Sequence, residues 1–445
     1  MKTPIADFLS RYAEGEAIRF HMPGHKGKGD TGCEKYDITE VFGADVLYSC
    51  EGIIKESEEY AKELFKTGAT YYSTEGSTLA IKAMLKLATD KDREKGVTPL
   101  VLAGRNAHKS FVLACALIGI DVEWIYPKEK SHISVCAITA SDVDTALSTL
   151  LRLPSAVYVT SPDYLGNIAD IRGISEVCLR HGVPLIVDNA HGAYLGFTSP
   201  VMHPIALGAA MCADSAHKTL PALTGAAYLH ISRDYPEYIG GAKSALSIFA
   251  STSPSYLILR SLDICNARTS GEYPESLARV IEEVGILKEK IRELGLTILS
   301  TEPLKITLAP NSFGYTGEEI ADILRKGGIE CEFSDYEYTV LMISPNNTSA
   351  ELSCLYRVLS EIKARVPITR EHLSLSPSVR VLSMREAIFA PREVVDVECA
   401  IGRICATPTV SCPPAIPIAV SGEVITEDAV SIFKKYGIST VEVVK

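Results

Sequence analysis

The chain has 445 residues, of which 47% are hydrophobic and 22% charged, and its formal net charge is −11. This length is enough for two or three packed domains, and the composition is that of an ordinary globular protein. The acidic balance, without a basic stripe, argues against nucleic acid as the main partner, and no stretch approaches the roughly 20 apolar residues of a membrane span.

The first twenty residues lack an apolar leader and instead predict a short amphipathic helix. The 12 cysteines are scattered, with no C-x-x-C pair and no His/Cys cluster at zinc spacing. We therefore expect reduced thiols, a cytoplasmic location and no metal site. A dense polar turn follows at 20–27, which is either only a turn or a segment that reaches into the site of a neighbouring subunit.

Short β-branched apolar runs alternate with helical stretches over the first 270 residues. The expected strands are 99–103, 122–126, 156–160, 184–188, 209–214 and 226–231. Helical runs lie between the first pair, at 107–119, and between the second pair, at 141–152. Strand–helix–strand units at this spacing predict a mostly parallel sheet covered on both faces, with ligands at the carboxyl ends of the strands.

After about residue 270 the pattern changes. A long amphipathic helix at 276–295 is followed by alternating strand-like and helical segments as far as residue 366. This order predicts a separate, smaller α+β domain. The tail contains the proline-bearing stretch 411–423, and we expect it to be irregular rather than helical.

Gly76-Ser77-Thr78 stands at the start of a helical run. Free backbone N–H groups, two hydroxyls and the positive end of the helix dipole make such a start suited to a phosphate group. The alternative is an ordinary helix N-cap by Ser77 or Thr78. The residue pair described next favours the phosphate site.

Asp188 ends the apolar run 184–188, and Lys218 follows thirty residues later, beside His217. A buried carboxylate needs a partner, for which a protonated pyridine nitrogen is suitable; a helix cap or a nearby arginine is the alternative. Small and apolar residues surround Lys218, so we expect burial to lower its pKa and make its amine nucleophilic. An exposed basic pair is the alternative for His217 and Lys218. Together, Asp188 and Lys218 indicate a pyridoxal phosphate (PLP) enzyme.

Two further residues are placed to contact such a cofactor. His108 follows the expected strand 99–103 at its carboxyl end, where an imidazole can stack on a ring; a packed or capping histidine is the alternative. Ser215, three residues before Lys218, can add a hydroxyl to the phosphate site.

With these motifs in this order, the chain resembles the Orn/Lys/Arg decarboxylases, PLP enzymes of the aspartate-aminotransferase-like fold (fold type I), in the short bacterial branch without an N-terminal wing domain. The matching segments are FHMPGHKGKG (20–29), DITEV (37–41), STEGSTLAIKAML (73–85), RNAHKS (105–110), DNAHGA (188–193), SAHKTLPALTGAAYLH (215–230) and STSPSYLILRSLD (251–263). The implied fold is α/β, with a large, mostly parallel domain and a smaller α+β C-terminal part. The expected division is an N-terminal arm (1–50), a PLP-binding domain (51–270), a small α+β domain (271–370) and a C-terminal decarboxylase-type domain (371–445).

The resemblance implies roles for single residues. Lys218 would bind the cofactor covalently, Asp188 would pair with its pyridinium nitrogen, and His108 and Ala190 would lie against the two faces of its ring. The phosphate would be surrounded by Gly76, Ser77, Thr78, Ser215 and His217. His191 would lie beside the substrate carboxylate. Thr252 would reach the phosphate site of the partner subunit in an obligate homodimer.

The implied reaction is decarboxylation of arginine to agmatine, of lysine to cadaverine or of ornithine to putrescine. Lys218 or His217 would return a proton to Cα. Candidates for binding the distal cation are Glu40, Asp163 and Glu386. One alternative is transamination or elimination, with the substrate carboxylate bound by an arginine such as Arg380, Arg385 or Arg403. A catalytically silent PLP-binding protein is the other.

The sequence departs from the family's pattern in two places. Asn189 stands where many relatives have the glutamate of D-E-A-H, and we expect its side chain to point away from the cofactor. The tail motif, Y-P-P-G-I-P in relatives, reads CPPAIP at 412–417. This second change leaves the preferred basic amino acid open.

Overall fold

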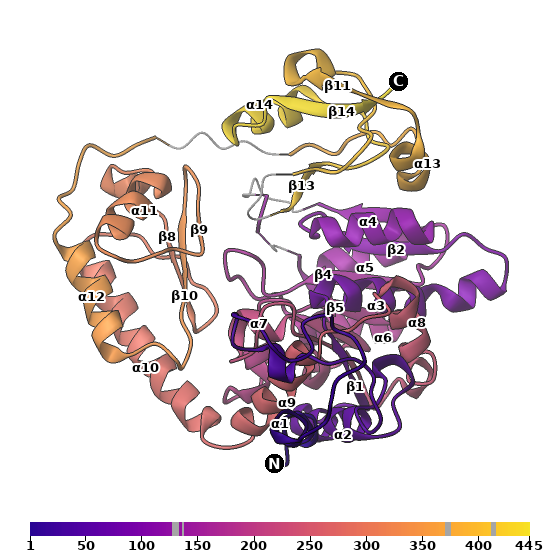
Figure 1. Cartoon of the computed structure of the whole chain (residues 1–445). Helices are drawn as coiled ribbons and strands as arrows, with labels where there is room; N and C mark the ends of the chain where they lie inside the picture. Colours follow the sequence, from indigo (N-terminus) through magenta and orange to yellow (C-terminus); the bar gives the residue numbers. More distant parts are fainter. Residues whose placement is uncertain (127–132, 136–137, 370–374, 411–414) are drawn as a thin grey trace. The chain divides into compact units, whose positions relative to one another are not determined.

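The computed structural model describes residues 1–126, 133–135, 138–369, 375–410 and 415–445 (Figure 1). Cys412, Pro413 and Pro414 of the altered tail motif lie outside the described residues, as does the expected domain boundary at 370–371. No helix in the described part of the chain combines the length and apolar content needed to cross a membrane.

A seven-stranded sheet has the strand order β1-β7-β6-β5-β4-β2-β3. The pairs β2/β3 and β5/β6 are parallel, whereas β7 pairs antiparallel with both β6 and β1. The strands are β1 (Ala69–Ser73), β2 (Leu100–Gly104), β3 (Asp121–Ile125), β4 (Ala156–Thr160), β5 (Leu185–Asp188), β6 (Met211–Asp214) and β7 (Ala227–Ile231). All six expected strands are present, and β4 has the predicted bounds. The edge strand β1 is not among the predicted strands.

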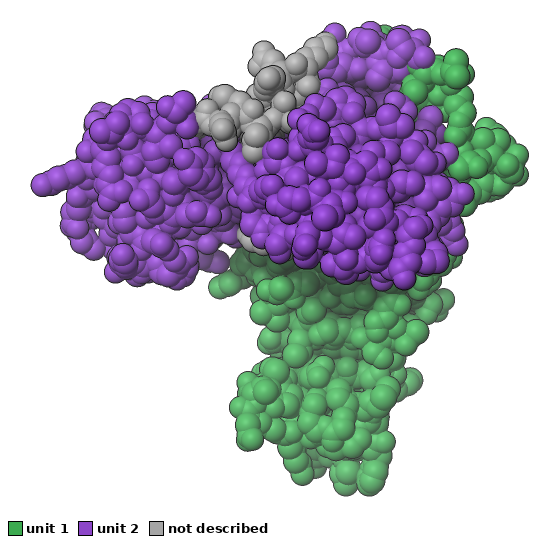
Figure 2. Space-filling model, turned by 90° about the horizontal axis from the view of Figure 1, so that it is seen from above, with its two compact units in different colours: residues 1–99, 150–159, 171–274 green, residues 100–149, 160–170, 275–445 purple. Residues whose placement is uncertain are grey.

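The chain divides into two compact units, which Figure 2 shows in different colours. Unit 1 consists of Met1–Pro99, Leu150–Val159 and Ile171–Pro274, and unit 2 of Leu100–Thr149, Thr160–Asp170 and Glu275–Lys445. The helices of unit 1 are α1 (Pro4–Glu14), α2 (Ile53–Phe65), α3 (Gly76–Glu94), α6 (Ile171–His181), the single turn α7 (Ala216–Thr219), α8 (Ala242–Phe249) and α9 (Tyr256–Thr269).

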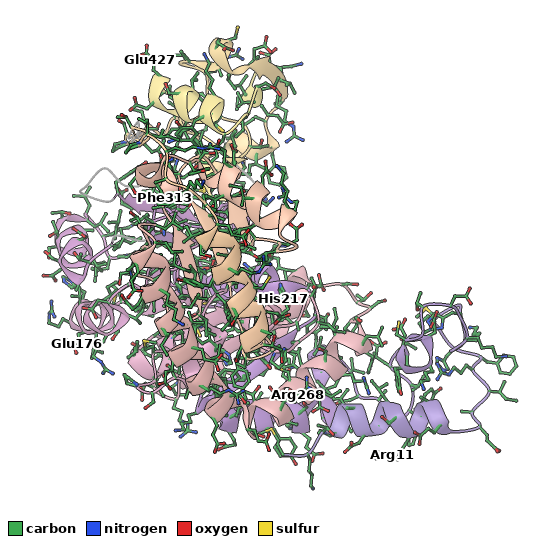
Figure 3. All side chains as sticks on the ribbon, turned by 90° about the vertical axis from the view of Figure 1, so that its left-hand side faces the viewer. Arg11, Glu176, His217, Arg268, Phe313 and Glu427 are labelled. Atoms are coloured by element: carbon green, nitrogen blue, oxygen red, sulfur yellow. The ribbon has the colours of Figure 1, made fainter. Side chains whose placement is uncertain are left out.

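The predicted N-terminal amphipathic helix is α1, which packs beside α9 (Figure 3, where Arg11 and Arg268 mark the two helices). It buries Ile5 and Leu9, and the backbone N–H groups of Ile5 and Ala6 each donate to Asp263 Oδ2 of α9 at 2.9 Å. A carboxylate at a helix N-terminus satisfies donors that the helix itself leaves unpaired. This contact fixes the start of the chain within unit 1.

Unit 2 contains a small antiparallel sheet of order β8-β10-β9, consistent with the predicted α+β pattern. Its helix α11 begins with a capping box in which the Thr316 hydroxyl accepts from Glu319 N and the Glu319 carboxylate accepts from Thr316 N. The elements of this part are α4 (Lys109–Ile118), α5 (Ala140–Thr149), α10 (Tyr273–Glu293, starting at the end of unit 1), β8 (Lys305–Leu308), α11 (Gly317–Lys326), β9 (Phe333–Ser334), β10 (Thr339–Met342) and α12 (Ser349–Ser360).

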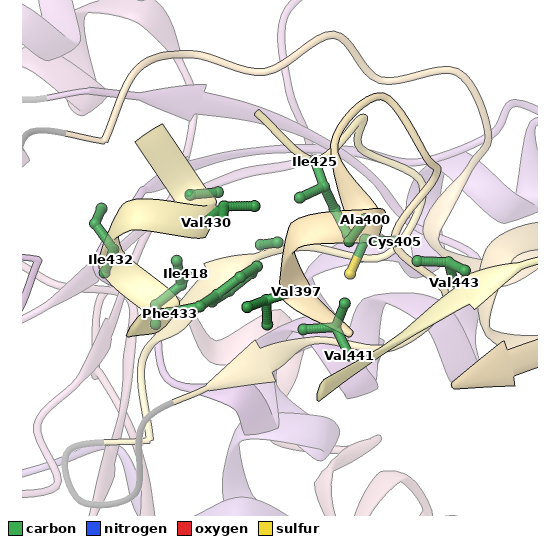
Figure 4. Close-up of a cluster of buried hydrophobic side chains, with 12 residues drawn as sticks. Val397, Ala400, Cys405, Ile418, Ile425, Val430, Ile432, Phe433, Val441 and Val443 are labelled. Atoms are coloured by element: carbon green, nitrogen blue, oxygen red, sulfur yellow. The ribbon is translucent and has the colours of Figure 1, made fainter. Parts of the chain in front are cut away.

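The expectation of an irregular tail is wrong. After residue 375 the described chain forms α13 (Met384–Phe389), β11 (Arg392–Asp396), β12 (Thr409–Val410), β13 (Pro417–Ala419), α14 (Glu427–Lys435) and β14 (Thr440–Val444). The Thr426 hydroxyl caps α14 by accepting from Ala429 N at 3.2 Å, and Phe433 on its inner face is fully buried in the core drawn in Figure 4. Pro417 is the first residue of β13, so a proline of the 411–423 stretch is itself part of this folded segment.

Candidate active site

Asp188 lies at the carboxyl end of β5, where four consecutive residues, Leu185–Asp188, are buried. Its carboxylate accepts a hydrogen bond from the Tyr158 hydroxyl at 3.1 Å and another from Ala190 N at 3.2 Å. Burial raises the pKa of Asp188, although the charge of Lys218 and these two hydrogen bonds act in the opposite direction. A cation bound against Asp188 would therefore offset the cost of holding its charge inside the protein.

Lys218 lies in the single helical turn α7, directly after strand β6. Its Nζ is 3.1 Å from Nε2 of His191, which is itself buried. The side chain of Lys218 is exposed and that of His217 half-buried, so the expected burial of the lysine is wrong for this chain. The turn after β6 carries the lysine outward while Ala216 and Thr219 face the core. The fold thus brings Lys218, His191 and Asp188 into one unit and leaves the amine accessible.

The start of α3 has the features expected of a phosphate site. The helix begins at Gly76, and its N-cap Glu75 makes no side-chain bond to the first turn, so the alternative of a cap by Ser77 or Thr78 is wrong. Gly76 has φ +70°, a conformation that favours glycine, and a Cβ there would meet no atom within 4 Å. The Ser215 hydroxyl donates to Ser77 Oγ at 2.8 Å, which joins two of the predicted phosphate ligands.

His217 (labelled in Figure 3) has Nδ1 2.9 Å from the Ala226 carbonyl oxygen. A carbonyl only accepts, so Nδ1 carries the hydrogen and Nε2 keeps its lone pair. Burial lowers the pKa of His217, and the charge of Lys218 acts in the same direction. His217 is therefore held as a neutral imidazole of defined tautomer.

The remaining predicted site residues of unit 1 differ in exposure. Ala190 is buried, whereas Thr78 and Thr252 are exposed in the single chain. Next to Thr252, the Ser251 N–H donates to the Glu75 carboxylate at 2.8 Å, which ties the 251–253 segment to the start of α3. Asn189 is fully buried, and its Nδ2 donates to Asp214 at 2.7 Å instead of to Asp188.

His108 belongs to unit 2. It is the N-cap of α4, and its Nδ1 accepts from Ser110 N at 3.2 Å. His108 therefore caps a helix, as the alternative interpretation predicts. Glu386 and Asp163, also of unit 2, serve local structure: Glu386 accepts from Ser383 in the capping box of α13, and Asp163 accepts from Asn167.

The sequence interpretation missed two features of the site. Tyr158 is one, a hydroxyl within the buried run of β4 that supports Asp188. The other is a group of buried side chains, His203, Asp214 and His230, brought together from three places in the chain. The available signal was a polar side chain within an apolar strand for Tyr158 and His230, and a carboxylate at the end of an apolar strand for Asp214.

Comparison with known proteins places the chain in a family. The family described as "Orn/Lys/Arg decarboxylase, major domain" matches residues 3–300. The chain belongs to the Orn/Lys/Arg decarboxylase family. It is thus an enzyme of a group of PLP-dependent amino-acid decarboxylases, as the sequence motifs predict.

Two curated relatives of this family match almost the whole chain. One is an arginine decarboxylase of Bacillus subtilis, 29% identical over 97% of this chain and 93% of the relative. The other is the uncharacterized protein YaaO of the same organism, 30% identical with the same coverage. Since 97% of this chain and 93% of each relative are covered, the chain and these relatives have nearly the same length, as predicted for the short branch.

Solved structures confirm the fold. The lysine decarboxylase LdcF of Francisella novicida superposes with a TM-score of 0.81 at 18% identity, covering 100% of this chain and 81% of that one. The constitutive lysine decarboxylase of E. coli gives 0.78 at 17% identity, with 100% and 82% covered. The fold is therefore that of fold type I PLP enzymes, with a mostly parallel sheet and small C-terminal antiparallel sheets.

The residues of unit 1 fit the cofactor that this family uses. PLP carries a phosphate, an aldehyde and a pyridine nitrogen, and each has a counterpart of suitable chemistry. The helix start at Gly76 is open and uncapped, the Lys218 amine is accessible, and Asp188 is a buried carboxylate whose raised pKa favours a cationic partner. Unit 1 therefore contains a group of suitable chemistry for each of these three parts of PLP.

Proposed function

We propose that this protein decarboxylates a basic amino acid at Cα, using PLP bound by Lys218, Asp188 and the start of α3. The observation that carries the proposal is the juxtaposition of Asp188 and the His191–Lys218 pair at adjoining strand ends, in a chain of the Orn/Lys/Arg decarboxylase family. Bound PLP supplies a sink for the electron pair that remains on Cα when carbon dioxide leaves.

The protein's own residues would then control charge and protons. Asp188, whose carboxylate accepts from Tyr158 and Ala190, would provide a fixed negative charge to keep the cofactor's ring nitrogen protonated. Such a charge lowers the barrier because it is in position before the reaction begins. His191 Nε2, 3.1 Å from Lys218 Nζ, is placed to accept a proton from the amine and so keep it nucleophilic.

A proton must return to Cα after carbon dioxide leaves. Lys218 Nζ and His217 are the candidates, because Lys218 is accessible and His217 lies next to it in sequence. Burial lowers the pKa of His217 and keeps its ring neutral, and the one N–H of that neutral ring, on Nδ1, donates to Ala226 O. Lys218 is therefore the stronger proton donor of the two.

Transamination receives less support. Arg380 donates to Val122 O, Arg385 to Leu117 O, and Arg403 to Val444 O and Glu393. All three guanidinium groups thus hold structure within unit 2. An arginine with such partners is a poor candidate for binding the α-carboxylate of a substrate.

We also propose that the enzyme is a homodimer with shared active sites. The support is the exposure of Thr252 in the single chain, on a segment already tied to α3 through Ser251 and Glu75. A second subunit would use this hydroxyl in its own phosphate site.

The experiment is to incubate purified, PLP-loaded protein separately with arginine, lysine and ornithine and to identify the amine by mass spectrometry. We test arginine first because curated relatives that match the chain over most of its length are arginine decarboxylases. A single methylene in a pocket is worth only about 1–3 kcal/mol, so all three substrates are compared. Lys218→Ala is the control. Formation of an amine by the wild type alone supports the proposal; a borohydride-trapped cofactor without any amine product contradicts the decarboxylase assignment.

A further inference from the structure

A second polar cluster lies behind the candidate active site in unit 1. In the antiparallel pair β6/β7, Cys212 is opposite His230, and in β1/β7 Thr70 is opposite the same histidine. Because side chains alternate along a strand, Cys212 and Asp214 point to the same face of the sheet as His230. His203, just before the turn Pro204–Leu207, completes the group. We call His203, Cys212, Asp214 and His230 the β6–β7 cluster.

The distances within this cluster match those between ligands of one metal ion. Nε2 of His203 lies 3.0 Å from Asp214 Oδ2, and Nε2 of His230 lies 3.3 Å from the same oxygen. Zinc–ligand bonds of about 2.0–2.1 Å in a tetrahedron place nitrogen and oxygen ligands about 3.3 Å apart. The three ligand atoms all lie within 4.8 Å of one another.

Cys212 is the candidate for a fourth ligand, and its Sγ would have to move to join the group, because the ligand atoms that lie within 4.8 Å of one another are those of His203, Asp214 and His230. Its Sγ is 3.8 Å from His203 Nε2 and 3.7 Å from Asp214 Oδ1. Tetrahedral bonds of about 2.3 Å to sulfur and 2.0 Å to nitrogen give a separation of about 3.5 Å.

One ligand atom of the cluster is buried without a hydrogen bond. Among the described residues, Nε2 of His230 has no hydrogen-bond partner, since its approach to Asp214 lacks the geometry of one, and the side chain is 0% exposed. Its other nitrogen, Nδ1, lies 2.8 Å from Thr70 Oγ1. If Nδ1 donates to that hydroxyl, Nε2 directs its lone pair into the cluster, as a metal ligand does.

The surroundings have the character of a structural metal site. His203, Asp214 and His230 are all almost fully buried, so an ion among them would be shielded from solvent. Asn189 donates to Asp214 Oδ1 at 2.7 Å and so orients the carboxylate. The ring of Phe65 covers both histidines, at centroid distances of 5.7 and 4.5 Å.

From this geometry we propose that the β6–β7 cluster is a structural site for a tetrahedral divalent transition metal ion of the zinc class, bound by His203, Asp214, His230 and Cys212. An ion there would join β6, β7 and the segment before Pro204, next to the strand that ends in Asp188. Ligands at 203, 212, 214 and 230 have none of the regular spacings by which zinc sites are found in a sequence. This site is independent of the proposed decarboxylation.

The test measures metal in the untagged, PLP-loaded chain, unfolded and refolded with zinc or cobalt(II) and then freed of loosely held ions. We expect about one metal ion per chain, and about a tenfold or greater loss of retained metal in His230→Gln. The matched control is Cys178→Ala, which removes another buried thiol of unit 1 and should retain the metal. Wild-type protein that refolds without retaining metal, or equal retention by folded His230→Gln, overturns the proposal.

Cobalt gives a second measurement that does not depend on the folding of His230→Gln. A cobalt ion bound to Cys212 has a sulfur-to-metal charge-transfer absorption, and Cys212→Ala should lose this band while Cys178→Ala keeps it. An unchanged band in Cys212→Ala would mean that another cysteine binds the metal and would refute the assignment.

Discussion

The substitution Asp188→Asn isolates the charge of Asp188 from its packing. Asparagine has nearly the same volume as aspartate and keeps an oxygen that can accept from Ala190 N, which lies 3.2 Å from the carboxylate in the wild type. The Tyr158 hydroxyl, a donor to the carboxylate, can rotate to accept from the new amide. Hydrogen bonds of this kind contribute about 0.5–1.5 kcal/mol each, and removing a buried charge offsets part of any loss. We therefore expect the free energy of unfolding to change by no more than about 2 kcal/mol.

Catalysis should respond far more strongly than stability. Removing one preorganised electrostatic group lowers kcat by about 10²–10³, equivalent to about 2.7–4 kcal/mol in the barrier. The matched control is Tyr158→Phe, which removes the 3.1 Å hydrogen bond and keeps the charge. Leaving a buried carboxylate oxygen without this donor should lower stability by about 1–3 kcal/mol, while kcat falls by no more than about tenfold.

Both variants are compared with the wild type by urea unfolding and by the rate of amine release. The expected result is a crossed pattern, with Asp188→Asn defective in kcat and Tyr158→Phe defective in stability. Near-normal kcat in Asp188→Asn would remove this carboxylate from the mechanism. A loss of several kcal/mol of stability in the same variant would show that its role is structural.

Three further predictions concern other residues of unit 1. Lys218→Ala should abolish activity and the covalent cofactor that borohydride traps on the wild-type chain; a trapped cofactor on the variant would exclude Lys218 as its attachment point. Mixing Lys218→Ala subunits with an inactive Thr252→Ala variant should restore part of the activity if the sites are shared, and no rescue would indicate self-contained sites. Burial raises the pKa of Asp263 to about 6, so the folded state holds this proton more tightly than the unfolded chain does. The stabilisation by protonated Asp263 is thus fully present below about pH 4 and is lost as the pH rises through 6, a change of roughly 3 kcal/mol in the free energy of unfolding. Urea unfolding at several pH values should show this change for the wild type but not for Asp263→Asn. Parallel plots of stability against pH for the two proteins would contradict the prediction.

The sheet could be predicted because its strands are short β-branched runs with strong local signals. The strand 156–160 has the predicted bounds, and the run at 184–188 differs from β5 by one residue. The edge strand β1 contains polar Thr70 and Ser73 and lies directly before a helix, so its sequence resembles a loop. The order of the strands follows from long-range pairing, which no local pattern reveals.

The sequence of the tail carries two opposing signals, since its prolines favour irregular structure and its capping residues favour a helix. Thr426 followed by two acidic residues, with lysines at 434 and 435, is the usual pattern of a helix start and end. Its core depends on contacts between Val397, Phe433 and Val441, which are distant in sequence (Figure 4). Hydrophobic partners at such separations can be assigned only when the fold is known.

The site residues fall into the same two classes. The sequence singles out Asp188 and Lys218 because a strand-end carboxylate and a lysine in an apolar loop are unusual by themselves, and their roles toward the cofactor stay predictions. The exposure of Lys218 was not predictable, since it depends on the direction in which the turn after β6 leaves the sheet. Nor could Asn189 be assigned to Asp214, because that contact depends on the pairing of β5 with β6.

The structure also explains which of two buried carboxylates is suited to a cationic ring. Asp188 and Asp214 end neighbouring parallel strands, and both are almost inaccessible to solvent. Asp214 already has two imidazoles and Asn189 around it, and its pKa is lowered, whereas burial raises the pKa of Asp188. Only Asp188 therefore gains substantially from a protonated nitrogen placed against it. Neutral Asn189 supports this separation, because it donates to Asp214, whereas a glutamate at that position would add a second negative charge beside it.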